Sequence, residues 1–176
     1  MKFHRHGSQQ KGFTLLELLA AIVIIGILGA IVISRINGGR ADGKAQNEAE
    51  IVVDMFNGML GLKANGSYGT AGTDLSGALI AKQKIPSVYN ATAGAVTNPW
   101  NGAVSYLSVG GTATLTENGY PPETCVAVVQ KVSALGAATI TVNGTALGTG
   151  AIAGPAAAAA CNKTTQANVV AIQSQS

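Results

Sequence analysis

An apolar run near the N-terminus limits what this chain can be. Residues 18–33 are 16 apolar or Gly residues without a break, and counting back to Phe13 gives 21 residues in which only Thr14 and Glu17 are polar. As a helix, 21 residues rise roughly 30 Å, which matches the hydrocarbon core of a bilayer. The sequence therefore predicts a membrane-spanning helix with one carboxylate inside it. Because a carboxylate in a span is costly, Glu17 is a functional hypothesis by default.

The head of this span carries a recognisable motif. The run Lys11-Gly-Phe-Thr-Leu-Leu-Glu17 resembles the prepilin-peptidase site of type IV pilins and related pseudopilins. In that family a leader is cut after a Gly, the new first residue is N-methylated, and a Glu four residues further on is needed for assembly. The resemblance implies that Gly12 precedes the cut, that Phe13 becomes N-methylphenylalanine, and that Glu17 is the assembly carboxylate.

The spacing of Phe13 and Glu17 suits this role. Residues i and i+4 lie on the same face of a helix, so Glu17 lies beside the amine of Phe13 within one subunit. In a staggered stack, the same carboxylate can instead neutralise the amine of a neighbour. An unpaired charge is penalised strongly in low dielectric, so this pairing gives the stack a preferred register.

Two simpler interpretations of the N-terminus compete with this one. A secretory signal peptide fits poorly, because the apolar core is long, no Ala-x-Ala site follows it and Glu17 stays unexplained. A plain single-span anchor explains the length and flanks, but not the motif at the head of the span.

Removal of residues 1–12 changes the charge and the available chemistry. Three of the 11 Lys and Arg residues and both histidines lie in that leader, which leaves eight basic against eight acidic residues. A basic surface for nucleic acid is therefore not indicated. Without histidine, Ser-His-Asp and Cys-His catalysis and His-based metal sites are excluded. We expect neither an enzyme nor a cofactor or metal site.

Two cysteines, Cys125 and Cys161, follow the predicted span. In an oxidising periplasm an isolated pair most simply forms one disulfide, and two free buried thiols are the alternative. The Asn98-Pro99-Trp100 turn, a cysteine within a helix and a second one near the C-terminus look like type IVb pilins. The 12-residue leader is shorter than many type IVb leaders, and Phe13 is the first residue usual in type IVa pilins. The subclass therefore stays open.

The resemblance also bears on pseudopilins of type II secretion. These commonly lack such a disulfide and often carry a carboxylate-rich calcium site near the C-terminus. No acidic residue follows Glu123, so the ligands for a calcium cage there are missing. A pilin is therefore favoured over a pseudopilin.

The expected fold class is α+β, the type IV pilin fold, with a long N-terminal helix packed on an antiparallel sheet and a disulfide-bounded C-terminal region. Residues 1–12 are the leader, 13–62 the helix with its transmembrane half at 13–33, and 63–176 the periplasmic or extracellular head. After Lys44 the helix turns amphipathic. Ile51, Met55 and Met59 recur at i+4 with Val52, Phe56 and Leu60 beside them, while Glu48, Glu50, Asp54 and Lys63 mark the wet side.

The head is predicted to contain two further helices and a sheet. Residues up to about 102 form a connecting region with a short helix at 74–83, and Trp100 is a core anchor rather than a ligand platform. A helix opens at Pro121-Pro122 and runs to about Leu135, burying Val126, Val129 and Val132. The segment 155–161 suits either a helical turn or a loop. Strands are expected at 103–109, 112–116, 138–142 (turning at Asn143-Gly144) and 168–173.

These features predict a structural subunit of a type IV pilus. The precursor is held in the inner membrane with a cytoplasmic N-terminus and then assembled as an extracellular homopolymer, in a fibre that supports adhesion, aggregation, motility or DNA transfer. The implied partners are the prepilin peptidase and methyltransferase, an ATPase, a platform protein and a secretin. A minor pilin, a type II secretion pseudopilin, and a membrane-tethered monomeric adhesion or binding protein are the alternatives.

Overall fold

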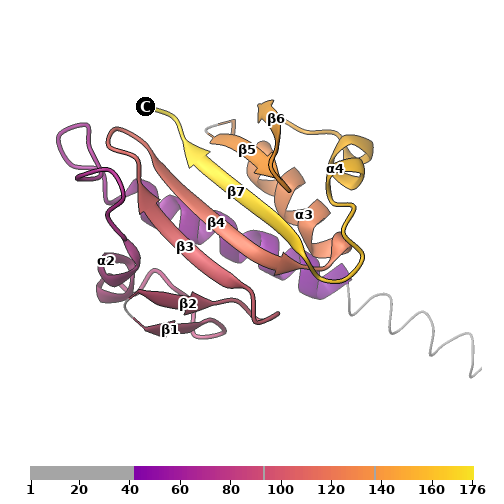
Figure 1. The fold of residues 1–176 in the computed structure, drawn as a ribbon, viewed down its shortest axis with the longest axis horizontal. Coiled ribbons are helices and arrows are strands. Elements are labelled where there is room, and N and C mark those ends of the chain that lie inside the picture. Colours follow the sequence, from indigo (N-terminus) through magenta and orange to yellow (C-terminus); the bar gives the residue numbers. More distant parts are fainter. Residues whose placement is uncertain (1–41, 93, 137) are drawn as a thin grey trace, which may run out of the picture. The chain divides into compact units, whose positions relative to one another are not determined.

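Helices pack on a single antiparallel sheet in this chain (Figure 1). The computed structural model describes residues 42–92, 94–136 and 138–176. In chain order the elements are a helix at residues 42–60, α2 (Ser76–Ala81), β1 (Asn90–Thr92), β2 (Ala95–Thr97), β3 (Ala103–Ser108), β4 (Ala113–Tyr120), α3 (Pro122–Ser133), β5 (Ala138–Val142), β6 (Thr145–Thr149), α4 (Gly154–Ala160) and β7 (Asn168–Ser174).

The seven strands run in the spatial order β1-β2-β3-β4-β7-β5-β6, and all neighbours are antiparallel. The strand β7 lies between β4 and β5, so it is an interior strand with a hydrogen-bonded neighbour on each side. Its residues alternate between buried and half-buried, which gives the sheet one fully covered face. The register lines up one buried row across four strands, made of Tyr106, Leu115, Ile172 and Ile140.

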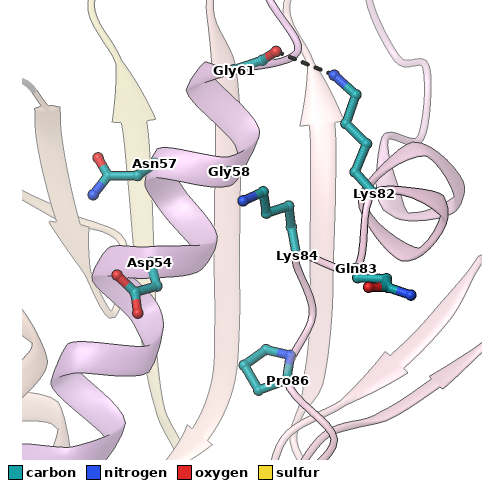
Figure 2. A pocket seen from close by; sticks show the side chains of 8 residues that line it. All are labelled: Asp54, Asn57, Gly58, Gly61, Lys82, Gln83, Lys84 and Pro86. Atoms are coloured by element: carbon teal, nitrogen blue, oxygen red, sulfur yellow. Dashed lines mark hydrogen bonds between the residues drawn. The ribbon is translucent and has the colours of Figure 1, made fainter.

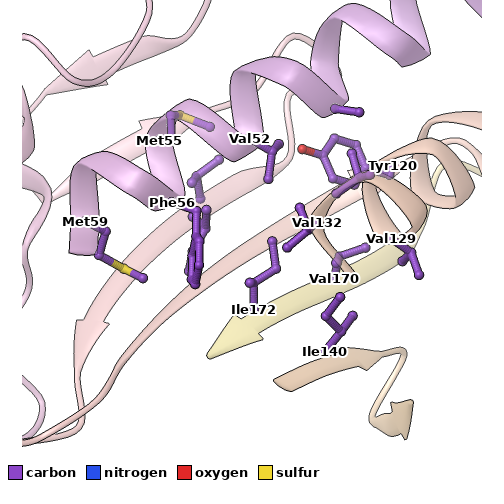
Figure 3. Packing of buried hydrophobic residues seen from close by; sticks show 14 of the residues in the cluster. Val52, Met55, Phe56, Met59, Tyr120, Val129, Val132, Ile140, Val170 and Ile172 are labelled. Carbon is purple, nitrogen blue, oxygen red and sulfur yellow. The ribbon is translucent and has the colours of Figure 1, made fainter. Parts of the chain in front are cut away.

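The helix at residues 42–60 covers this face with the apolar stripe that the sequence predicts (Figure 3). Val52, Met55, Phe56 and Met59 are all fully buried, at the i, i+3, i+4 and i+7 spacing of one helix face. The helix ends at residue 60 and two turn residues follow, so the expected end near Leu62 is right within two residues.

Helix α3 completes the layer beside β5 and β7. Pro121 and Pro122 begin it, because proline needs no hydrogen-bond partner in a first turn. Val129 and Val132 are buried as predicted. Val126 is only half-buried, however, and Val128 takes the fully buried place.

The disulfide between Cys125 and Cys161 is present and confirms the predicted pairing. The two Cα atoms are 5.8 Å apart across a sequence separation of 36 residues. Cys125 lies in α3 and Cys161 directly follows α4, so the bond ties these two helices together. A closed loop of this length stabilises the fold by roughly 4 kcal/mol in the chain-entropy model.

Several sequence expectations need correction. The region up to residue 102 is not merely connecting, because β1 and β2 form a hairpin there that extends the sheet. The strand predicted at 112–116 continues as β4 to Tyr120, and β6 pairs with β5 where no strand was expected. The alternative left open at 155–161 resolves as the helix α4.

Substitution of Gly102 tests how tightly the turn before β3 packs. A Cβ at this position would lie 1.7 Å from the backbone oxygen of Asn118, which cannot move without disturbing β4. We expect Gly102→Ala to lower the free energy of unfolding by about 3 kcal/mol or more, the upper range for overpacking. Thermal unfolding of the full chain in detergent, followed by fluorescence of Trp100, measures this.

Gly111→Ala is the matched control, since its nearest contact for a Cβ is 3.8 Å away. It should change the stability by less than about 1 kcal/mol. Equal losses in the two variants would contradict the tight packing at Gly102.

Candidate functional site

The residues predicted to act in processing and assembly, Gly12, Phe13 and Glu17, lie outside the residues that the structure describes. The same is true of the predicted span at 13–33. Among the helices of residues 42–176 that are described, none has the length and hydropathy that crossing a bilayer requires. Within the described residues, the candidate site is a polar cluster where the helix meets the sheet.

Two carboxylates are buried in this cluster. Glu48 of the helix at residues 42–60 is 2% exposed, and Glu117 of β4 is fully buried. The prediction that Glu48 lies on the wet side of the helix is therefore wrong. An isolated buried charge is costly, so such a pair persists only where hydrogen bonds and protonation compensate it.

Tyrosine hydroxyls from two other segments supply these hydrogen bonds. Tyr89, which precedes β1, donates to Glu48 Oε1, and Tyr120 at the end of β4 donates to the same oxygen at 2.9 Å. Tyr89 Oη also lies 3.2 Å from Glu117 Oε1. The carboxylate of Glu48 thus joins the helix to two segments of the sheet layer. No buried side-chain nitrogen or oxygen of the described residues lacks a partner.

Asn98 connects the cluster to the turn before β3. Its Nδ2 donates to Glu117 Oε2 at 3.2 Å and to the backbone oxygen of Asn118 at 2.8 Å. Its Oδ1 accepts the backbone N–H groups of Trp100 and Gly102 at 3.1 and 2.9 Å. The predicted Asn-Pro-Trp turn is therefore confirmed, and its first residue is part of the buried network.

The environment of the two carboxylates assigns one proton to the pair. Burial and the nearby charge of Glu48 raise the pKa of Glu117 to about 8. Burial also raises the pKa of Glu48, and hydrogen bonds from Tyr89 and Tyr120 offset only part of that rise. Because Glu48 accepts both tyrosine hydroxyls, we assign the negative charge of the pair to Glu48 and the proton to Glu117.

The geometry agrees with this assignment. The Tyr89 hydroxyl has one proton, which it donates to Glu48, its closer partner. In the contact between Tyr89 and Glu117, the protonated carboxyl group of Glu117 is therefore the donor and the Tyr89 oxygen is the acceptor. Burial raises the pKa of both Tyr89 and Tyr120, and so does the charge that Glu117 carries once it has lost its proton, so both hydroxyls remain donors.

A groove of about 260 Å³ lies beside the cluster. Lys44, Ile51, Val88 and Trp100 are among its lining residues. Trp100 is half-buried and meets the ring of Tyr120 edge-on, with the ring centroids 5.5 Å apart. The predicted role of Trp100 as a packing residue is confirmed, although one side of it stays accessible.

Sequence spacing alone could have placed both carboxylates. Glu48 lies four residues before Val52 and seven before Met55, so the helical period puts it on the buried stripe. Glu117 alternates with Leu115 and Ala113 along β4, so the strand period turns it inward. Glu48 was nevertheless predicted to be exposed, because it is charged, although the helical period places it on the buried face.

The cluster does not offer a catalytic or metal-binding arrangement. Its oxygens are occupied by tyrosine and asparagine donors. Within the described ranges, no three His, Cys, Asp or Glu residues gather where they could hold a metal ion. What the arrangement does is to hold the helix, the turn and β4 in one register.

Two family models match the chain. The model described as PilS N terminal matches residues 43–175, and the one described as the prokaryotic N-terminal methylation motif matches residues 7–33. The chain is also 31% identical over 113 residues to type II secretion system core protein G of Vibrio cholerae serotype O1. That alignment covers 61% of this chain and 77% of that protein.

The fold is similar to the crystal structure of a type IVb pilin from Salmonella typhi. The TM-score is 0.56 at 15% identity, and the match covers 74% of this chain and 97% of that one. This match shows that the two chains share one fold, a helix packed on an antiparallel sheet. The chain belongs to the family described as PilS N terminal, and its function is that of a pilus structural subunit.

The buried pair predicts a specific dependence of stability on pH. The folded pKa of Glu117, about 8, exceeds its ordinary value of 4.5, so the unfolded chain loses this proton first. Stability is therefore greatest below pH 4.5 for this group and is lost as the pH rises toward 8, by several kcal/mol. Glu117→Gln keeps a donor for Tyr89 and an acceptor for Asn98 without the ionisation. We expect it to be the more stable protein at pH 8, by roughly 2 kcal/mol or more.

Thermal unfolding of the full chain between pH 4 and 9, followed by fluorescence of Trp100, measures this difference. Glu50→Gln is the control, because Glu50 is exposed and pairs only with Lys131 across 3.5 Å. It should shift stability by less than about 1 kcal/mol. If wild type and Glu117→Gln lose stability in parallel as the pH rises, the protonated state assigned to Glu117 is wrong.

Proposed function

We propose that this pilin is the major subunit of its pilus and is processed at the N-terminal motif. The prepilin peptidase cuts between Gly12 and Phe13, and Phe13 is then N-methylated. Residues 1–12 are the leader, residues 13–62 form one helix whose first half at 13–33 spans the inner membrane, and residues 63–176 are the head. The observation that carries this proposal is the match of residues 7–33 to the methylation motif directly before the pilin head.

Assembly follows from the charge placed inside the span. Before assembly, Glu17 lies in lipid near its own N-terminal amine. In the fibre, each Glu17 neutralises the amine of Phe13 in a neighbouring copy, which sets the stagger between subunits. The further partners are an ATPase that drives extraction, a platform protein and a secretin. We assign the chain no catalytic role, in keeping with a family of structural proteins.

A second candidate function is that of a type II secretion pseudopilin. The 31% identity to the core protein G of Vibrio cholerae favours it. Against it stand the disulfide between Cys125 and Cys161 and the absence of acidic residues after Glu123 in the sequence. Long surface fibres that contain this chain at natural expression levels support the pilin. A periplasmic location, with loss of protein secretion when the chain is deleted, supports the pseudopilin.

The mass of the mature chain tests the processing step. We expect a polypeptide that begins at Phe13 and carries one extra methyl group, by intact-mass spectrometry of membranes or fibres. Gly12→Glu should leave the uncut precursor, because the residue before the cleaved bond is changed. A mature chain that begins at Met1, or that lacks the whole span, would falsify the processing site.

Substitution of Glu17 tests the assembly step separately. Glu17→Val makes the span more apolar, so we expect membrane insertion to persist while fibres are lost or strongly reduced in electron micrographs. Thr14→Val removes the other polar side chain of the span and is the matched control. Normal fibre numbers in Glu17→Val count against charge pairing in the stack.

A further inference from the structure

Two grooves of opposite charge border the helix at residues 42–60. The first, of about 620 Å³, lies between the end of this helix and the segment that follows α2, and its lining contains Lys82 and Lys84 together with the single carboxylate of Asp54 (Figure 2). The second, of about 360 Å³, lies between the start of the described helix and α3, and it contains Asp42 and Glu123. We call them the basic groove and the acidic groove.

The side chains of the two lysines in the basic groove extend toward the helix. Figure 2 shows both side chains extending to the helix while Gln83 between them points away. Lys82 Nζ donates to the backbone oxygen of Gly61 at 3.4 Å. The stem of Lys84 lies so close to Gly58 that a Cβ there would come within 2.9 Å of it. Within the described residues, neither lysine forms an ion pair, since that between Lys131 and Glu50 is the one present.

The acidic groove has the complementary composition. The carboxylates of Asp42 and Glu123 line it together with Gln46 and Gln130, and no lysine of the described residues lines it. Glu123 stands exposed in the first turn of α3. Because different partner elements build the two grooves, one along α3 and one after α2, they lie at different ends of the same helix (Figure 1).

We propose that the basic groove binds the acidic groove of a second copy of this chain, with Lys82 and Lys84 facing the carboxylates of Glu123 and Asp42. This inference rests on the proposed function as a pilus subunit and names a contact between the heads. A twofold dimer through the acidic groove would bring only like charges together, and one through the basic groove would set four lysines against two carboxylates. Two different, complementary surfaces instead form a heterologous contact, which propagates into an open helical assembly.

The expected strength of the contact fits such an assembly. A single exposed ion pair contributes little free energy, because water and salt screen it. In a fibre, however, the contact recurs at every subunit, so weak pairs act together along the length. Like charges placed opposite each other repel, and complementary charges fix register and partner choice more than raw affinity.

Charge reversal tests the contact in the full chain within its own pilus system. Lys84→Glu and Glu123→Lys should each lower the number of fibres per cell by at least about tenfold, because each places like charges across the contact. The double variant restores opposite charges with the polarity exchanged, and it should recover fibres to near the wild-type level. Electron microscopy and the amount of pilin sheared from cells provide the counts.

Matched controls separate the contact from folding. Lys163→Glu reverses an exposed lysine outside both grooves and should leave fibre numbers unchanged. Pilin abundance and the oxidised state of Cys125 and Cys161 report whether each head has folded. If Lys84→Glu fails that check, Lys82→Glu replaces it in the same design.

The outcomes separate this contact from the proposed function. Normal fibres in both single variants would show that this pairing does not hold neighbouring heads together, and the proposal would be wrong. It would also be wrong if the double variant failed to recover fibres. In either case the wild-type chain still forms fibres and remains a pilus subunit. Absence of the wild-type chain from fibres would instead overturn the proposed function itself.

Discussion

A charged carboxylate in the apolar face of a helix is the constraint on which the rest of the head depends. Glu48 is only 2% exposed, so its charge depends on the hydrogen bonds that Tyr89 and Tyr120 donate to it. Sliding the helix by one turn, about 5.4 Å, would move the charge away from both donors. Apolar contacts tolerate many registers, whereas this contact tolerates one. Burial of a polar network is a weak source of net stability, and its effect here is to select a single arrangement of helix and sheet.

Two parts of the core are held by different interactions, one by apolar packing and the other by this hydrogen-bond network. In the middle of the sheet, the row of Tyr106, Leu115, Ile172 and Ile140 is held by close packing. Beside β1 and the turn before β3, hydrogen bonds through Asn98 and Glu117 hold the chain instead. That corner contains two strands of only three residues each, so these hydrogen bonds add to the short ladder that positions it. Glu117 can be buried beside the charged Glu48 because Glu117 is neutral, so the two carboxyl groups do not repel each other.

Sequence periodicity predicted the elements whose residues repeat clearly. The stripe of the first helix, the boundaries of β5 and the proline start of α3 follow from spacing and turn residues, and the disulfide follows from there being two cysteines. The hairpin of β1 and β2 was missed because strands of three residues carry no readable alternation. The burial of Glu48 was missed for a different reason. The helical period placed it inward, but no local signal shows that hydroxyls 41 and 72 residues further along the chain will meet it.

The packing of the helix also limits how the head can contact its neighbours. Its apolar stripe is already filled by the sheet and α3, and every exposed position of the described helix is polar or Gly. Residues 42–60 therefore have little apolar surface left for a second copy. In the fibre that we propose, the apolar segment at 13–33 provides cohesion that is nearly independent of register, because lipid-like surfaces slide over one another at little cost. In this proposal, register comes from groups that are sensitive to position, which are the predicted charge of Glu17 and the charged grooves beside the helix.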